Sequence, residues 1–257
     1  MRRFGVVGCG VIGSEISRAI DRGIISGRLT ALCDTNLQKA QTLLKKLNKK
    51  PRVCSLKVLI KQSDVIIEAA GPGAVALLLE HNEIARKTLL VMSAGGLITN
   101  PTLVKRASQK QTKILLPSGA LAGLDGVRAA SVAGITEAVL TTTKPPRGLK
   151  GAPYCIQHDI DLDGITKPRC IFSGNVMQAV KGFPANINVA ALLAMAGIGP
   201  HKTKVRIIAD PHTKTNTHQI TVHSKAGVIT TKTENVPSPS NPKTSYLAVM
   251  SAIAALK

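Results

Sequence analysis

The sequence predicts an α/β protein, in which a Rossmann-type, doubly wound parallel sheet is joined by a second, smaller α+β domain. A glycine-rich turn lies between an apolar run and an amphipathic stretch at residues 4–20, which is the order of a strand, a turn and a helix. Apolar runs then alternate with helical patterns as far as residue 116, which favours a parallel sheet. Beyond Gly134 the expected strands have few helices between them, which favours an α+β arrangement.

The glycine-rich turn, Gly8-x-Gly10-x-x-Gly13, joins a strand expected at Phe4–Val7 to a helix expected at Val11–Ile20. Gly8 permits the tight turn, Gly10 lets the backbone approach a pyrophosphate, and Gly13 lets helix and strand pack closely. The N-terminus of the helix offers N–H groups to the phosphates. The motif therefore predicts dinucleotide binding, unless its glycines serve only a packed turn. The expected cofactor contacts are Gly8, Gly10, Val11, Ile12 and Gly13.

Asp34 follows the next expected strand, Arg28–Cys33, and lies 21 residues after Gly13. An acid at this distance binds the ribose hydroxyls of a dinucleotide. Its charge repels a 2′-phosphate, which favours NAD over NADP. The nearby Lys39 and the basic cluster at residues 45–52 oppose that preference, so the use of NADP stays open.

The rest of the first domain continues the alternation of strands and helices. Ligands of such sheets bind beyond the carboxyl ends of the strands, which adds Ala70 to the expected cofactor contacts. Asn and Pro are suited to the N-cap and first turn of a helix. The expected helices are one begun by Asn36 and ending near Asn48, one begun by Gly71-Pro72 and one begun by Asn100-Pro101, and the expected strands are Asp64–Ala69, Thr88–Met92 and Lys113–Leu116.

The second domain begins with an expected exposed strand at Glu137–Thr143, and residues 148–168 look irregular. Residues 234–243 look like a linker, and the apolar helix expected at Ser245–Leu256 should pack back on the first domain, because alone it could not bury its face. We therefore expect one domain of residues 1–116 plus 240–257, and another of 117–239. The remaining expectations are helices at Val176–Val180 and 185–195, and strands at Val205–Ala209, Gln219–Val222 and Val228–Thr233.

Composition limits the class of protein. The formal net charge is +20, but only 2% of residues are aromatic, and none of these interleave with the densest basic cluster to stack bases. We therefore expect no nucleic acid as the main ligand, and we expect no membrane, because no apolar run reaches a membrane span. The glycines and Glu15 interrupt the start that imitates a signal peptide. Five scattered cysteines suggest reduced thiols and a cytoplasmic protein.

Several motif blocks closely resemble the L-aspartate dehydrogenase family, and together they run in order along essentially the whole chain. The match is poorer between Gly148 and Arg169. The blocks are Gly8–Gly13, 117–125 (PSGALAGLD), 183–189 (FPANINV), Asp210-Pro211 with Asn216 and His218, and 234–239 (ENVPSP) followed by 241–246 (NPKTSY).

This resemblance implies NAD(P)-dependent oxidation of L-aspartate to iminoaspartate. The imine would hydrolyse to oxaloacetate and ammonia or feed quinolinate and NAD synthesis, and reductive amination is the reverse reaction. It also implies a homodimer. Carried onto this sequence, the family's catalytic acid/base falls on His218, and its NAD contacts fall on Ala122 and Asn188.

The chemistry suits these residues. Oxidation of an amino acid needs a base that removes a proton from the ammonium group. In the reverse reaction the same group must return that proton, so a group that titrates near neutrality suits both directions. The residues alone do not single out His218 among six histidines, and His212 is the second candidate. Asn188 could instead cap a helix.

Two substrate carboxylates require cations or hydrogen-bond donors. The candidates are Ser118, Lys144 and Lys243, with Thr142 as a further donor to a carboxylate or to the cofactor amide. No spacing typical of a metal site is present. The other readings are a related two-domain dehydrogenase or reductase of another small acid, of the homoserine or dihydrodipicolinate type, and an NAD-binding protein without catalysis.

Overall fold

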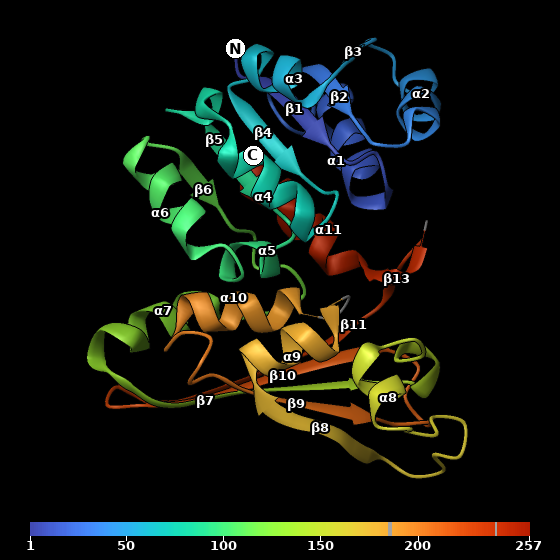
Figure 1. The fold of residues 1–257 in the computed structure, drawn as a ribbon, viewed down its shortest axis with the longest axis vertical. Coiled ribbons are helices and arrows are strands. Elements are labelled where there is room, and N and C mark those ends of the chain that lie inside the picture. Colours follow the sequence, from blue (N-terminus) through green and yellow to red (C-terminus); the bar gives the residue numbers. More distant parts are fainter. Residues whose placement is uncertain (185–186, 240) are drawn as a thin grey trace. The chain divides into compact units, whose positions relative to one another are not determined.

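The computed structural model describes residues 1–184, 187–239 and 241–257, and for 241–243 the backbone alone. The chain divides into two compact units, Met1–Pro117 with Val249–Lys257 and Ser118–Ala248 (Figure 1). Each unit is described by itself below. In the described part of the chain, no helix has the length and apolar character that a membrane span needs.

The first unit contains a parallel six-stranded sheet in the order β3-β2-β1-β4-β5-β6. This sheet confirms the predicted doubly wound architecture. Strand β3, which the sequence did not predict, has only two residues and stands at one edge of the sheet. The strands are β1 (Arg3–Val7), β2 (Arg28–Cys33), β3 (Arg52–Val53), β4 (Val65–Glu68), β5 (Thr88–Val91) and β6 (Lys113–Leu115).

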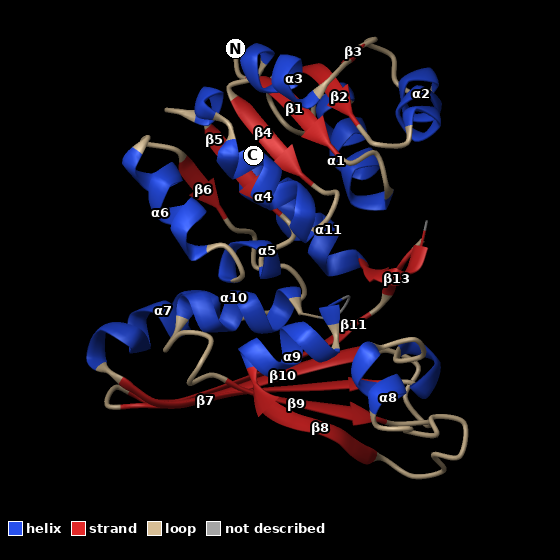
Figure 2. Cartoon of the chain, viewed as in Figure 1, coloured by secondary structure: helices blue, strands red, loops and turns tan. Residues whose placement is uncertain are grey.

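Helices cover both faces of this sheet (Figure 2). Alternate residues of β1 serve the two sides, because Phe4 and Val6 belong to one buried cluster and Val7 to the other. The first cluster takes residues from α1 (Val11–Asp21), α2 (Leu37–Lys45) and α11 (Tyr246–Leu256). The second takes residues from α3 (Leu56–Gln62), α4 (Pro72–Glu80), α5 (Gly95–Ile98) and α6 (Pro101–Gln109).

Helix α11 packs on the first unit, as predicted. Ala252 and Leu256 are buried in the same cluster as Phe4 and Ile16. The guanidinium of Arg2 donates a hydrogen bond to the Leu256 carbonyl at 3.2 Å. The two ends of the chain therefore meet in one core.

The predicted starts of α2, α4 and α6 are correct, but one capping bond is absent. The side chain of Asn36 accepts a hydrogen bond from the Lys39 N–H, and α2 ends at Lys45, before the predicted Asn48. Pro72 and Pro101 occupy the first turns of α4 and α6. Asn100 makes no side-chain capping bond; its amide donates instead to the Gly96 carbonyl at 2.8 Å.

The second unit contains a five-stranded mixed sheet in the order β11-β10-β7-β9-β8. Its strands are β7 (Ile135–Lys144), β8 (Arg169–Asn175), β9 (Lys204–Ala209), β10 (Asn216–Ser224) and β11 (Gly227–Asn235). One face of this sheet, the inner face, is covered by α7 (Leu124–Ala133), α9 (Val176–Gly182) and α10 (Asn188–Ala196), as Figure 2 shows. The helix expected at 185–195 is α10, which begins at Asn188, and its predicted start at 185 lies outside the described residues.

Strand β7 was expected to be exposed, but it is the middle strand of this sheet. Its threonines alternate in burial, so that Thr142 is 3% exposed on the inner face while Thr141 and Thr143 point to the outer face. The Thr-rich composition favours an exposed strand, because the sequence does not reveal that the expected strands β9 and β10 pair with β7 on either side.

The expectation of a linker at residues 234–243 is wrong, because strands occupy most of this range. Glu234 and Asn235 end β11, and the short strands β12 (Pro237–Ser238) and β13 (Asn241–Ser245) pair after it, with residue 240 outside the described part of the structure. Prolines and serines imitate a linker because they are common in turns. The sequence also did not predict α3, α5, α7, β8 or α8 (Pro153–Gln157), the last of which lies within the segment expected to be irregular.

Candidate active site

The glycine turn joins β1 to α1 at the carboxyl edge of the parallel sheet. Gly8 has φ +93°, and a Cβ there would lie 2.6 Å from the backbone of Ala69. A Cβ on Gly13 would lie 1.9 Å from the Gly8 carbonyl oxygen. These two glycines are therefore required by the folded chain itself.

Gly10 differs from the other two glycines. It has φ −73°, a conformation open to any residue, and a Cβ there would meet no atom within 4 Å. It is exposed and stands at the N-cap of α1, where no side chain caps the helix. The protein alone does not require glycine here, whereas a pyrophosphate lying against the helix N-terminus does. Val11 and Ile12 form the start of the same helix.

Asp34 is held against the glycine turn. Its carboxylate accepts hydrogen bonds from the N–H groups of Cys9 at 2.6 Å and of Asn36 at 2.8 Å. These bonds fix the half-buried carboxylate directly after β2, where a ribose hydroxyl is expected. Burial, then the nearby Asp34 and Cys33, raises the pKa of the Cys9 thiol to about 12, so Cys9 stays protonated and serves as packing.

Glu68 is a site residue that the sequence analysis missed. It ends β4, and its side chain is fully buried. One carboxylate oxygen accepts the N–H groups of Ala70 and Gly71, each at 2.8 Å. The carboxylate also accepts the Ser93 N–H at 2.9 Å and the Ser93 hydroxyl at 3.0 Å.

Glu68 therefore ties together the two loops that follow β4 and β5, beside the glycine turn. Because the Ala70 N–H already donates to Glu68, Ala70 could contact a cofactor only through its other atoms. The sequence did contain a signal, an acid that ends an apolar run immediately before a small-residue loop.

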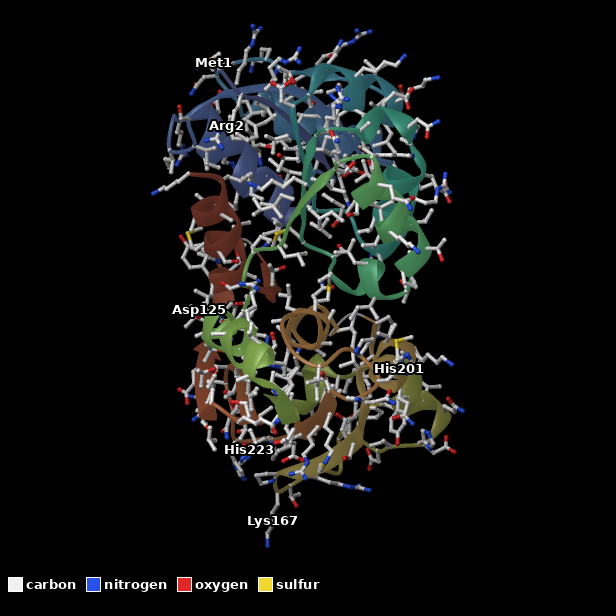
Figure 3. All side chains as sticks on the ribbon, turned by 90° about the vertical axis from the view of Figure 1, so that its left-hand side faces the viewer. Met1, Arg2, Asp125, Lys167, His201 and His223 are labelled. Carbon is white, nitrogen blue, oxygen red and sulfur yellow. The ribbon has the colours of Figure 1, made fainter. Side chains whose placement is uncertain are left out.

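In the second unit, His218 and Thr142 are direct neighbours on the antiparallel strands β10 and β7. The Nδ1 atom of His218 lies 3.0 Å from the Thr142 hydroxyl oxygen, and both residues are buried on the inner face. His223, which has the opposite orientation on β10, is exposed (Figure 3). Burial, and then the charge of Lys144, lowers the pKa of His218 to about 3. The imidazole is therefore neutral at physiological pH, which differs from the near-neutral titration expected for it.

Lys144 is the last residue of β7 and points to the same face as Thr142. It is half-buried, and burial lowers the pKa of its ammonium to about 8. Lys144 also lines a cavity of about 620 Å³, together with Asn216 of β10. Three further cations line this cavity, namely Arg147, Lys150 and Lys214.

The loop that contains Ala122 is fastened to β11, the strand next to His218. Thr231 donates its hydroxyl to the Ala122 carbonyl at 2.9 Å, and Thr233 donates to the Ala120 carbonyl at 2.8 Å. Thr233 is also the strand partner of His218. Two threonines that the sequence does not single out thus hold the loop with the exposed Ala122 against β11, the neighbour of the strand that carries His218.

The remaining candidates have less defined surroundings. Ser118 is exposed, and Asn188 is the half-buried first residue of α10, one position after the N-cap. His212, the second candidate for the acid/base, is exposed in a turn, where its backbone N–H donates to the Asp210 carboxylate. Lys243 lies in β13, but its side chain is outside the described part of the structure. In the described residues, no three His, Cys, Asp or Glu are grouped to hold a metal ion.

A family model described as aspartate dehydrogenase, C-terminal, matches residues 125–257, and one described as homoserine dehydrogenase, NAD binding domain, matches residues 8–117.

Full-length relatives match as well. An L-aspartate dehydrogenase of Methanosarcina mazei is 46% identical, and the match covers 100% of this chain and 96% of the relative. One of Nitrosopumilus maritimus is 42% identical with the same coverage. The crystal structure of an aspartate dehydrogenase from Thermotoga maritima has the same fold, with a TM-score of 0.72, 20% identity and coverage of 100% of this chain and 94% of that one.

Proposed function

The chain belongs to the L-aspartate dehydrogenase family, and on this premise we propose that it oxidises L-aspartate to iminoaspartate with NAD(P). One observation supports a role for these residues in the reaction. His218 and Thr142 form a buried pair on the same sheet face as Lys144, and Lys144 lines a cavity rich in cations. A base and cations for two carboxylates are what a small amino diacid requires. Iminoaspartate then hydrolyses to oxaloacetate and ammonia, and the reverse reaction is reductive amination.

The first unit supplies most of the proposed cofactor contacts, whereas Ala122 and Asn188 belong to the second unit. When bound, the nicotinamide cofactor would supply the hydride acceptor for oxidation at Cα of the substrate. The bare surface at Gly10 and the start of α1 would hold the pyrophosphate, and the fixed Asp34 carboxylate would accept hydrogen bonds from the ribose hydroxyls. The carboxylate would repel a 2′-phosphate, so we propose NAD as the preferred cofactor over NADP. Ala70, Ala122 and Asn188 remain proposed contacts.

The second unit supplies the residues for the substrate. Lys144 binds one substrate carboxylate, and the guanidinium of Arg147 is suited to bind the other in a bidentate fashion. Ser118 and Lys243 remain proposed contacts. Lys150 contributes less, because it is paired with Asp163 at 2.7 Å.

His218 takes the proton from the substrate ammonium and so leaves a neutral amine. For this step Nε2 must carry the free electron pair, so the proton of the neutral imidazole is on Nδ1, which donates to the Thr142 oxygen. Thr142 therefore fixes the direction of the ring, and its hydroxyl can accept from Nδ1 in this tautomer. The low pKa of His218 keeps the imidazole unprotonated but also makes it a weak base. The substrate carboxylates would raise that pKa when they bind, and so strengthen the base.

We further propose that the protein is a homodimer of the cytoplasm that serves pyridine nucleotide biosynthesis. The outer face of the five-stranded sheet supports the dimer, since the helices of that unit lie on the inner face (Figure 2). Its central positions, Val139, Thr141 and Thr221, are half-buried. Sedimentation should give twice the chain mass of 27.0 kDa, and Thr141→Arg should shift the protein toward the monomer.

Initial rates of NADH formation test the activity. We expect turnover with L-aspartate and NAD, and consumption of NADH with oxaloacetate and ammonium. Glutamate, homoserine and alanine serve as controls for the substrate class. Turnover of one of these in the absence of any with aspartate would contradict the proposal, and NAD binding without any turnover would favour a non-catalytic protein.

A further inference from the structure

Basic side chains gather at the amino edge of the six-stranded sheet, the edge opposite the glycine turn. The neighbouring parallel strands β1, β2 and β3 each begin with an arginine, namely Arg3, Arg28 and Arg52. With Lys49 and Lys50 these residues line a hollow of about 390 Å³, which we call the arginine hollow. The proposed function uses none of these five residues.

The positive charges of the arginine hollow are only partly balanced. Arg3 forms a bidentate pair with Asp64, with N–O distances of 2.6 and 3.1 Å, and its hydrogen bond lowers the pKa of Asp64 to about 2. Among the described residues, neither Arg28 nor Arg52 forms an ion pair, and both are exposed. Arg28 stands directly opposite Arg3 in the strand register, where like charges repel each other.

The two lysines are held by different helix ends, Lys50 by the end of α2 and Lys49 by the end of α1. The Lys50 ammonium donates to the carbonyls of Leu44 and Leu47 at 3.1 and 2.6 Å. The Lys49 N–H donates to the Asp21 carboxylate at 2.9 Å. Asp21 and Asp64 are thus the carboxylates tied to residues of the hollow, against five cations. A bound anion of several charges would remove the remaining repulsion.

We propose that the arginine hollow binds a polyphosphate chain, either free or as the phosphates of a nucleotide. Guanidinium groups bind phosphate oxygens in a bidentate fashion and keep their charge at any physiological pH. None of the described residues that line the hollow is aromatic, so nothing there can stack on a base. The hollow should therefore recognise phosphates and ignore the nucleoside, and binding should weaken as salt screens the exposed charges.

The test is calorimetric titration of the protein saturated with NADH, so that the dinucleotide site is filled. Tripolyphosphate, ATP and adenosine are the three probes. We expect tripolyphosphate and ATP to bind with similar affinity at low salt, and adenosine to show no binding. The double variant Arg28→Gln/Arg52→Gln should lose about tenfold in affinity, as expected for two exposed ion pairs.

The matched control removes two charges elsewhere in the same unit. Lys105→Gln/Arg106→Gln changes two exposed residues of α6, which leads into β6 at the other end of the sheet. The affinity of this control variant for tripolyphosphate should fall by less than about twofold, and both double variants should keep their aspartate turnover. Equal losses in the two variants, no binding of tripolyphosphate to the NADH-loaded protein, or binding of long RNA alone would each overturn the proposal.

Discussion

Replacement of Glu68 by Gln should weaken the cofactor loops without touching the substrate residues. The amide oxygen can still accept from Ala70 and Gly71, but the NH₂ group that replaces the second oxygen faces the Ser93 N–H. One buried donor loses its partner and the remaining bonds lose their charge assistance. Each such loss costs about 1–3 kcal/mol, and the gain from not burying a charge offsets part of it, so we expect the unfolding free energy to fall by about 2–3 kcal/mol.

Calorimetry and steady-state kinetics measure the two consequences. The melting temperature should fall by about 5–10 °C. The KM for NAD should rise about tenfold, while the KM for aspartate changes less than about twofold, because Glu68 and Ser93 both lie in the first unit. Ser17→Ala is the control, since the buried Ser17 hydroxyl of the same unit has no hydrogen-bond partner among the described residues. A Glu68→Gln protein with wild-type stability and wild-type KM for NAD would refute the reasoning.

Four further predictions concern the proposed site. His218→Asn should lower kcat at least about 100-fold while NADH affinity, followed by fluorescence, is kept; an unchanged kcat would remove the imidazole from the mechanism. Because burial lowers the pKa of Lys144 to about 8, its charge is lost as the pH rises through that value. Inhibition by succinate should weaken there, and Lys144→Met should abolish this dependence. Asp34→Ala should reduce the ratio of NAD to NADP efficiency about tenfold, and a constant ratio would contradict its role. Gly10→Ala should raise the KM for NAD yet change stability by less than about 0.5 kcal/mol, because its Cβ would meet nothing within 4 Å; a large loss of stability would show that the turn itself needs this glycine.

The sequence predicted those parts of the first unit whose signals are local. The strand Arg28–Cys33 has the predicted bounds, and Asp34 follows it in contact with the glycine turn. The short strand β3 was missed, because two residues carry too little periodicity to predict a strand. Glu68 was missed because its partners, the N–H groups of two loops, become neighbours only when β4 and β5 pair.

In the second unit, the features that the sequence left open depend on pairing between distant segments. The Thr142–His218 contact joins residues 76 positions apart, and no local pattern predicts that register. The depressed pKa of His218 has the same origin, because burial beneath the packed helices is not visible in a list of residues. The composition of residues 234–243 is that of turns and so predicts a linker, whereas β12 and β13 pair there as short antiparallel strands.

The junction of the chain's two ends has a consequence for biosynthesis. The core that holds Phe4 and Ile16 also needs Ala252 and Leu256, which leave the ribosome after all of residues 118–248. The nascent first unit must therefore wait with part of its apolar surface uncovered while the second unit is translated. Release of a polypeptide cut before residue 249 should yield a species that chaperones retain and proteases remove, even though every residue of the glycine turn is present.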